Sequence, residues 1–234
     1  MLNSDGWIDG ITASGVVIFG ILFGLFFMYK AVKTKAKLLF YLGLANILAG
    51  LMFLGVFTDF LLVLFTESNI DNTNGLDGIL SYIWFAPVII VSMFIGAELL
   101  TPRIKWYIVI IFLILGIVFE IVIFVDPIGS FYFDEPITSP PKELIDYNVN
   151  LDTLAGILMG CFLLSVLFFL GFGFLYKAFQ STGEIKRKFF FLSIGVFCFC
   201  IFGLLEGLTA PGYLVIIVRI GYLSSFWFMY IGLK

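Results

Sequence analysis

Seven apolar stretches, each long enough to cross a lipid bilayer, limit what this chain can fold into. A membrane-spanning helix needs about 20 consecutive, mostly apolar residues. The stretches are Ile11–Tyr29, Leu38–Phe65, Ile79–Leu100, Tyr107–Val125, Leu154–Tyr176, Phe189–Leu208 and Tyr213–Leu233. Hydrophobic residues make up 62% of the 234 residues and charged residues only 12%, and a water-soluble domain could not cover so much apolar surface. The sequence therefore predicts an all-α integral membrane protein, a seven-transmembrane helix bundle that occupies residues 1–234 as a single domain.

Polar and proline-rich segments separate these stretches. Asn69–Gly78 is rich in Asn, Asp and Gly, and Asp126–Asn150 contains four prolines. Both compositions are typical of loops. Ala210–Gly212 predicts a tight turn between the last two helices. The second stretch is long enough to tilt strongly or to end early, near Asp59.

Lysine and arginine are concentrated in alternate connections between the stretches. The connections after the first, third and fifth stretches, together with the last residue, carry Lys30, Lys33, Lys35, Lys37, Arg103, Lys105, Lys177, Lys186, Arg187, Lys188 and Lys234. The other connections are acidic, and Lys142 is their single basic residue. Because cytoplasmic loops are enriched in Lys and Arg, this pattern predicts a protein of the cell membrane with its N-terminus outside and its C-terminus in the cytoplasm.

Short motifs recur in the two halves of the chain. The first stretch ends in FFMYKA at Phe26–Ala31 and the fifth in GFLYKA at Gly173–Ala178. The third contains MFIG at Met93–Gly96 and the last contains MYIG at Met229–Gly232. These matches predict a 3+1+3 parallel repeat, with units at about residues 11–100 and 154–234 and a connector helix at about residues 107–125. Chance is the alternative, because aromatic and Lys-rich helix ends recur at membrane interfaces.

This topology resembles a known heptahelical group, which includes microbial opsins, sugar-carrying seven-helix transporters and G-protein-coupled receptors. The segments Gly96–Leu100 (GAELL) and Lys105–Tyr107 (KWY) also resemble uncharacterised seven-helix membrane proteins of archaea. The resemblance covers the whole chain, at the level of topology, and implies a seven-helix bundle. The motifs depart from each family. The last stretch has no internal lysine for a retinal Schiff base, the Pro-Gln motif of the sugar carriers is missing, and no cysteine is placed for the receptors' outer-loop disulfide. Covalent retinal is therefore not expected.

Four ionisable residues fall at a similar depth within the predicted spans: Asp59, Glu120, Glu206 and Arg219. With a rise of ~1.5 Å per residue, Glu120 and Glu206 lie roughly 20 and 26 Å from the cytoplasmic ends of their helices, and Arg219 roughly 9 Å from the outer end. In a hydrocarbon core about 30 Å thick, these residues share the outer third to half. Charges at such depth are costly and mark candidate functional sites. Glu98 differs, because it lies near the cytoplasmic end of its helix.

Arg219 should not stand alone in lipid. Glu206 is its expected partner, because the tight turn makes the last two helices antiparallel neighbours, and Glu120 is the second choice. The pair can be a structural clasp between helices, or it can line a pocket that holds water or a ligand. Three acids face one base, so at least one acid must be protonated, bind water or hold a cation, which favours the pocket.

Aromatic residues could complete this pocket. Tyr82, Trp84 and Tyr222 join Asp59, Glu120, Glu206 and Arg219 as the predicted ligand-binding set. Aromatic faces attract organic cations. Tyr and Trp are also ordinary residues of the membrane interface, and that alternative stays open.

No motif in the sequence indicates catalysis. The chain has no histidine, and its three cysteines lie inside apolar stretches, so we expect no enzyme, metal site, cofactor or nucleic-acid partner. The first hypothesis is a receptor or sensor that binds a small polar or cationic ligand and acts on a cytoplasmic protein partner. The alternative is a small-solute or proton-linked transporter that uses the same site, with Asn46 or Glu98 as candidate inner gates. A structural membrane subunit is the third hypothesis.

Overall fold

Six helical segments are long and apolar enough to cross a membrane in this computed structural model, which describes all residues except 1, 135, 137–139, 210 and 211. They are α1 (Ser4–Thr34), α4 with α5 (Leu76–Tyr82 and Phe85–Leu100), α6 (Lys105–Val125), α8 with η1 and α9 (Leu154–Val166, Leu167–Gly171 and Phe172–Gln180), α10 (Gly183–Glu206) and α11 (Tyr213–Leu233). A seventh span results if the bent pair α2 (Lys37–Leu51) and α3 (Leu54–Thr66) is counted as one. The predicted mostly helical, multi-pass membrane fold is confirmed at this level.

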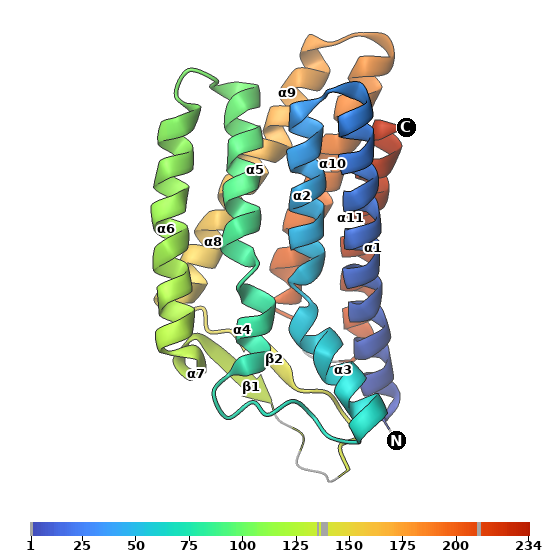
Figure 1. The fold of residues 1–234 in the computed structure, drawn as a ribbon, viewed down its shortest axis with the longest axis vertical. Helices are drawn as coiled ribbons and strands as arrows, with labels where there is room; N and C mark the ends of the chain where they lie inside the picture. The colour runs from blue at the N-terminus through green and yellow to red at the C-terminus, as the bar shows by residue number, and fades with distance from the viewer. Residues whose placement is uncertain (1, 135, 137–139, 210–211) are drawn as a thin grey trace.

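The second span neither ends near Asp59 nor runs straight. It breaks between α2 and α3, which are bent by 47° with respect to each other, and then continues to Thr66. The break is stabilised from a neighbouring helix: the Gly55 backbone N–H donates a hydrogen bond of 3.0 Å to Oγ of Ser81, on α4. A buried N–H released from a helix needs such a partner. The bend carries α3 over the end of the bundle that holds the N-terminus (Figure 1).

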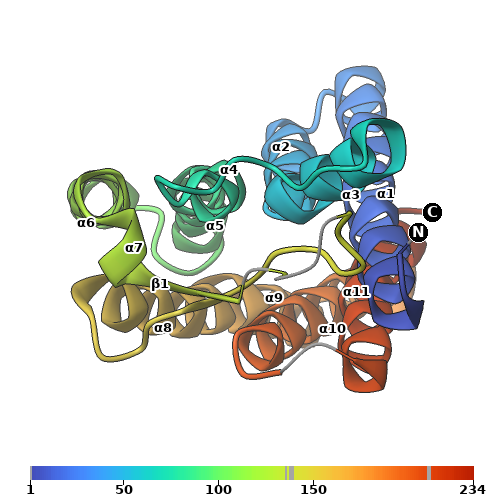
Figure 2. The ribbon, with the colours of Figure 1, turned by 90° about the horizontal axis from the view of Figure 1, so that it is seen from below.

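The helices form a ring with one helix outside it. Seen along the bundle, α1, α2, α5, α9, α10 and α11 surround a central region, and α6 lies outside this ring, where it packs against α5 and α8 (Figure 2). Close packing of α1 on α2 depends on glycine, because a Cβ on Gly20 would lie 2.6 Å from Cα of Gly50.

The two ends of the bundle differ in composition. We call the end with the N-terminus, α3 and α7 (Pro127–Ser130) the hairpin end, and the opposite end, with the C-terminus and the α1–α2, α5–α6 and α9–α10 connections, the lysine end (Figure 1). All basic residues except Lys142 and Arg219 lie at or near the lysine end. The N-terminus lies at the hairpin end and the C-terminus at the lysine end (Figure 1).

A β-hairpin closes the hairpin end, and the all-α prediction did not include it. Strands β1 (Phe131–Asp134) and β2 (Asp146–Val149) pair antiparallel, with Phe131 opposite Val149 and Asp134 opposite Asp146. The Phe131 ring stacks on Tyr82 of α4, with ring centres 4.9 Å apart. The prolines correctly indicated a break in helix, but short strands cannot be recognised in an irregular loop from so few residues. The tight turn predicted at Ala210–Gly212 includes two residues outside the described part of the chain.

Candidate ligand-binding site

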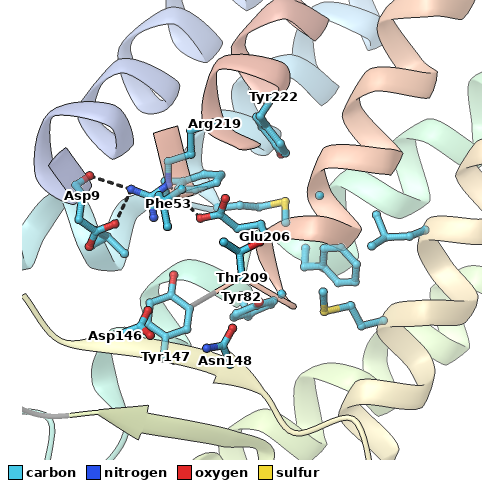
Figure 3. Close-up of a pocket in the computed structure, with 18 of the residues that line it drawn as sticks. Asp9, Phe53, Tyr82, Asp146, Tyr147, Asn148, Glu206, Thr209, Arg219 and Tyr222 are labelled. Atoms are coloured by element: carbon cyan, nitrogen blue, oxygen red, sulfur yellow. Dashed lines mark hydrogen bonds and ion pairs between the residues drawn. The ribbon is translucent and has the colours of Figure 1, made fainter. Parts of the chain in front are cut away.

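A cavity lies between the hairpin and the adjacent ends of the helices (Figure 3). It has a volume of about 60 Å³, and one buried water needs about 10–15 Å³ on the same measure, so several waters or one small molecule fit. Its walls are formed by Asp9, Met52, Phe53, Val56, Tyr82, Phe85, Asp146, Tyr147, Asn148, Met159, Leu163, Phe199, Gly203, Glu206, Gly207, Thr209, Val215, Arg219 and Tyr222. These residues come from both ends of the sequence and from the hairpin, so the cavity depends on the complete fold.

Arg219 is the centre of an ion-pair cluster on one side of the cavity (Figure 3). Its Nε donates to Oε1 of Glu206 at 2.9 Å, which confirms the predicted pair. Its Nη1 lies 2.5 Å from Oδ1 of Asp9 and also donates to the Asp9 carbonyl at 2.7 Å and to Oγ1 of Thr12 at 2.9 Å. The guanidinium carbon lies 5.2 Å from the centre of the Phe53 ring. The Arg219 side chain, 5% exposed, thus joins α1, α10, α11 and the α2–α3 break.

The chain positions this cluster by simple local rules. Glu206 is the last residue of α10, and Arg219 lies in the second turn of α11, so the short connection between these helices brings the two side chains to one level. Asp9 reaches the same level because α1 begins at Ser4, seven residues before the predicted start. The side chain of Asn3 caps this helix by accepting the N–H of Gly6 at 2.8 Å.

Negative charge exceeds positive charge around the cavity. Three carboxylates, of Asp9, Asp146 and Glu206, face the single guanidinium of Arg219. Burial raises the pKa of Asp146 to about 6, the negative charge of Asp9 adds to this rise, and Arg219 opposes it. With all three acids ionised, the site would carry a net charge of −2, which is +1 from Arg219 and −3 from the acids.

Two polar atoms in the cavity walls remain without a hydrogen-bond partner among the described residues. They are Oε2 of Glu206 and the hydroxyl of Tyr222. Buried polar atoms almost always have partners, and exceptions mark strain or a place where water or a ligand binds. The cavity therefore has polar capacity that the protein itself does not satisfy.

The hairpin forms the roof of the cavity through Asp146, Tyr147 and Asn148. The Tyr147 ring packs edge-on against Tyr82, with ring centres 5.9 Å apart. Burial raises the pKa of Tyr147 well above its usual range, so its hydroxyl stays neutral. Strand β2 thus contributes one carboxylate and two neutral polar groups to the site.

Four of the seven residues predicted for the site line this cavity: Tyr82, Glu206, Arg219 and Tyr222. Asp59 does not line it. The buried Asp59 carboxylate accepts the N–H of Ile70 at 2.7 Å, the N–H of Ile145 at 2.9 Å and the Asn69 amide at 2.9 Å. Since Ile145 directly precedes β2, Asp59 anchors the roof of the cavity.

Glu120 and Trp84 lie outside the cavity. Glu120 lines a separate, otherwise apolar groove of about 520 Å³ between α5 and α6, near Pro87 and Gly116. Its two carboxyl oxygens and the indole N–H of Trp84 have no hydrogen-bond partner among the described residues. Glu120 does not pair with Arg219, although a similar depth was predicted for both, because α6 lies outside the ring. The second carboxylate that pairs with the guanidinium is that of Asp9.

Sequence reasoning missed Asp9, Asp146, Tyr147 and Asn148 as wall residues. In the sequence, the acidic residues Asp9 and Asp146 indicate only the orientation of the chain in the membrane. A signal for Asp9 was present, since Asn3-Ser4-Asp5 is typical of a helix start and would have placed Asp9 inside the first helix. No local pattern marks Asp146–Asn148, whose place depends on the hairpin.

A second, smaller cavity lies further along the bundle. It has a volume of about 20 Å³ and is mainly apolar, with Asn46 and Ser92 as its polar residues. Phe199 lines both cavities. Glu98 lines neither cavity and pairs with Lys105 at 2.6 Å, towards the lysine end.

The ring, the outer helix and the cavity with its buried arginine define the class as a multi-pass helical membrane protein with a cluster of charged residues at one end. In comparisons with protein-family models, curated proteins and solved structures, no match to this chain was found. Among the described residues, no group of three or more His, Cys, Asp or Glu side chains is arranged to hold a metal ion.

Proposed function

We propose that this chain is a receptor- or sensor-like membrane protein that binds a small polar or cationic ligand in the cavity beside Arg219. The observation that carries this proposal is the excess of carboxylates around the cavity. A structural clasp needs only one acid and one base, whereas this cavity contains Asp9, Glu206 and Asp146 around a single arginine. Ionisable groups at membrane depth are costly and typically belong to functional sites.

The ligand would enter from outside the cell, under the hairpin. This orientation is part of the proposal and is supported by the basic residues gathered at the lysine end, which favour a cytoplasmic position. The same basic residues could bind a cytoplasmic protein partner or anionic lipid. The 3+1+3 repeat is also part of the proposal, and the position of the connector α6 outside the ring supports it.

Helices α10 and α11 connect the cavity to the lysine end. Glu206 and Arg219 lie on these two helices, and at the far end of α11 the Leu233 carbonyl accepts a hydrogen bond from the Lys30 side chain. A ligand that competes for Glu206 would weaken its pair with Arg219. The resulting shift of α10 against α11 would be transmitted to the lysine end.

A ligand screen on the purified full-length chain tests this function. A ligand that binds the folded state alone raises the apparent stability by RT ln(1 + [L]/Kd), which is about 2.7 kcal/mol at 100 times Kd. We expect at least one small polar or cationic compound to raise the midpoint of thermal unfolding. The shift should persist in a Glu120→Gln variant, whose substitution lies outside the cavity. If substitutions of the residues that line the cavity leave this shift unchanged, the compounds bind elsewhere and the proposal is wrong.

Transport is the second candidate function, and the smaller cavity favours it. Phe199 lines both cavities, and the smaller one contains the polar residues Asn46 and Ser92. In a transporter, the screened ligand would accumulate in proteoliposomes, and Phe199→Ala would change the rate. Binding without any uptake would favour the receptor.

A further inference from the structure

We propose that the cavity selects a compact organic ammonium ion, whose N–H groups bind the Asp146 carboxylate beside Glu206 and whose short apolar tail lies against Met159, Leu163 and Phe199. This inference rests on the proposed ligand-binding function and narrows it to one chemical class.

The charges around the cavity disfavour an anionic ligand. The guanidinium is already engaged, since Nε bonds to Glu206 and Nη1 contacts Asp9 and Thr12. An anion at the remaining guanidinium nitrogen, Nη2, would still face the three carboxylates of the cavity walls. A monocation instead reduces the excess negative charge of the three acids.

Asp146 is the acceptor that remains for this cation. It lines the cavity, and no ion pair of its carboxylate is found among the described residues, unlike Asp9 and Glu206, which both pair with Arg219. Asp146 is also close enough to Asp9, Glu206 and Arg219 for all three charges to affect its pKa. An ammonium group carries N–H donors that carboxylates accept in strong, charge-assisted hydrogen bonds.

The remaining walls suit a small apolar tail. Phe53 is stacked with Arg219, but Tyr82, Phe85, Phe199 and Tyr222 leave aromatic surface on the cavity, next to Met159 and Leu163. A volume of about 60 Å³ corresponds to roughly four to six water-sized groups. The ligand therefore has about as many heavy atoms as n-butylammonium, and amines with longer chains exceed the space.

Four probes of nearly equal size separate charge, donors and shape. They are n-butylammonium, n-butanol, butyrate and tetramethylammonium, titrated into the purified full-length chain at neutral pH with binding measured by calorimetry. We expect n-butylammonium to bind most tightly, because it alone combines positive charge with N–H donors. Tetramethylammonium has the charge without donors, and butanol has a donor without charge.

Asp146→Asn is the decisive variant because Asp146 belongs to no ion pair that the fold needs. Loss of a charged hydrogen bond is worth about 1.5–3 kcal/mol, so affinity for n-butylammonium should fall at least about tenfold. Glu98→Gln serves as the matched control, since it also removes one acid, near the lysine end and outside both cavities, and should leave the affinity unchanged.

The outcomes distinguish this inference from the proposed function. Preferential binding of butyrate or butanol would overturn the ammonium assignment and leave a ligand site in place. Equal binding of n-butylammonium by the native chain and Asp146→Asn would also overturn it. If none of the four probes binds, the ammonium assignment fails, and the proposed function is then decided by the wider ligand screen.

Discussion

The sequence predicts comparable depths in the membrane for Glu206 and Glu120, yet the fold gives them opposite surroundings. Glu206 lies on a ring helix, bonds to Arg219 and lines the cavity. Glu120 lies on the helix outside the ring, beside an apolar groove and with no partner among the described residues. The comparison teaches that depth along a helix does not identify a site in a membrane protein. Whether a residue belongs to a site depends on which side of the bundle its helix presents it to.

The largest expected effect concerns Arg219. Arg219→Ala leaves Glu206 and Asp9 without their shared cation, and breaking a buried pair in this way costs about 3–5 kcal/mol. Glu206→Ala should cost less, because Asp9 still pairs with the guanidinium. Denaturant unfolding in detergent micelles measures both values. In the double variant the cost should be clearly smaller than the sum, whereas additive costs would show that the residues do not interact.

A smaller loss is expected for Asp59, which anchors the roof without lining the cavity. Asp59→Ala leaves the N–H groups of Ile70 and Ile145 without their acceptor, and an unsatisfied buried group costs about 1–3 kcal/mol. Amide exchange at Ile145 should also become faster, as measured by hydrogen–deuterium exchange. Unchanged exchange at Ile145 would contradict the anchoring role.

Glu120 should respond in the opposite direction. Glu120→Leu removes a covered carboxyl that has no partner and adds apolar surface in the groove, so stability should rise by about 1 kcal/mol. The same unfolding assay measures this change, and ligand binding in the cavity should not alter. A loss of stability would mean that the carboxyl has a polar partner, and the contrast with Glu206 would then disappear.

The last expected effect is a pH dependence from Asp146. Its folded-state pKa of about 6 lies above the ordinary value of 3.8, so ionisation disfavours the folded state. The contribution of Asp146 to stability is fully present below about pH 3.8 and decreases as the pH rises through 6. In Asp146→Asn this contribution to the pH profile should be missing. If stability instead rises with pH in this window in the native chain and this rise is lost in Asp146→Asn, the prediction is wrong.

The multi-pass helical fold could be predicted because each apolar stretch carries its own signal. Arg219 and Glu206 could also be paired from sequence, since one short connection joins their helices. Asp9 and Asp146 could not be assigned to the site, because their positions depend on contacts between segments far apart in the chain. The hairpin is the clearest case: Asp146 reaches the cavity only when Asp59 holds Ile145, and no local pattern encodes that bond.

The central claim is that the Arg219 cluster belongs to a ligand site and is more than a clasp between helices. It is tested most directly in a variant that combines Arg219→Met with Glu206→Leu, which replaces the pair by apolar side chains of similar size. Such replacements are often neutral for stability, and the remaining Asp9 side chain is 19% exposed and can be hydrated. Calorimetric titration of this variant with the best ligand of the screen is the measurement. The account predicts a folded protein that no longer binds, and a folded variant that binds as tightly as the native chain would contradict it.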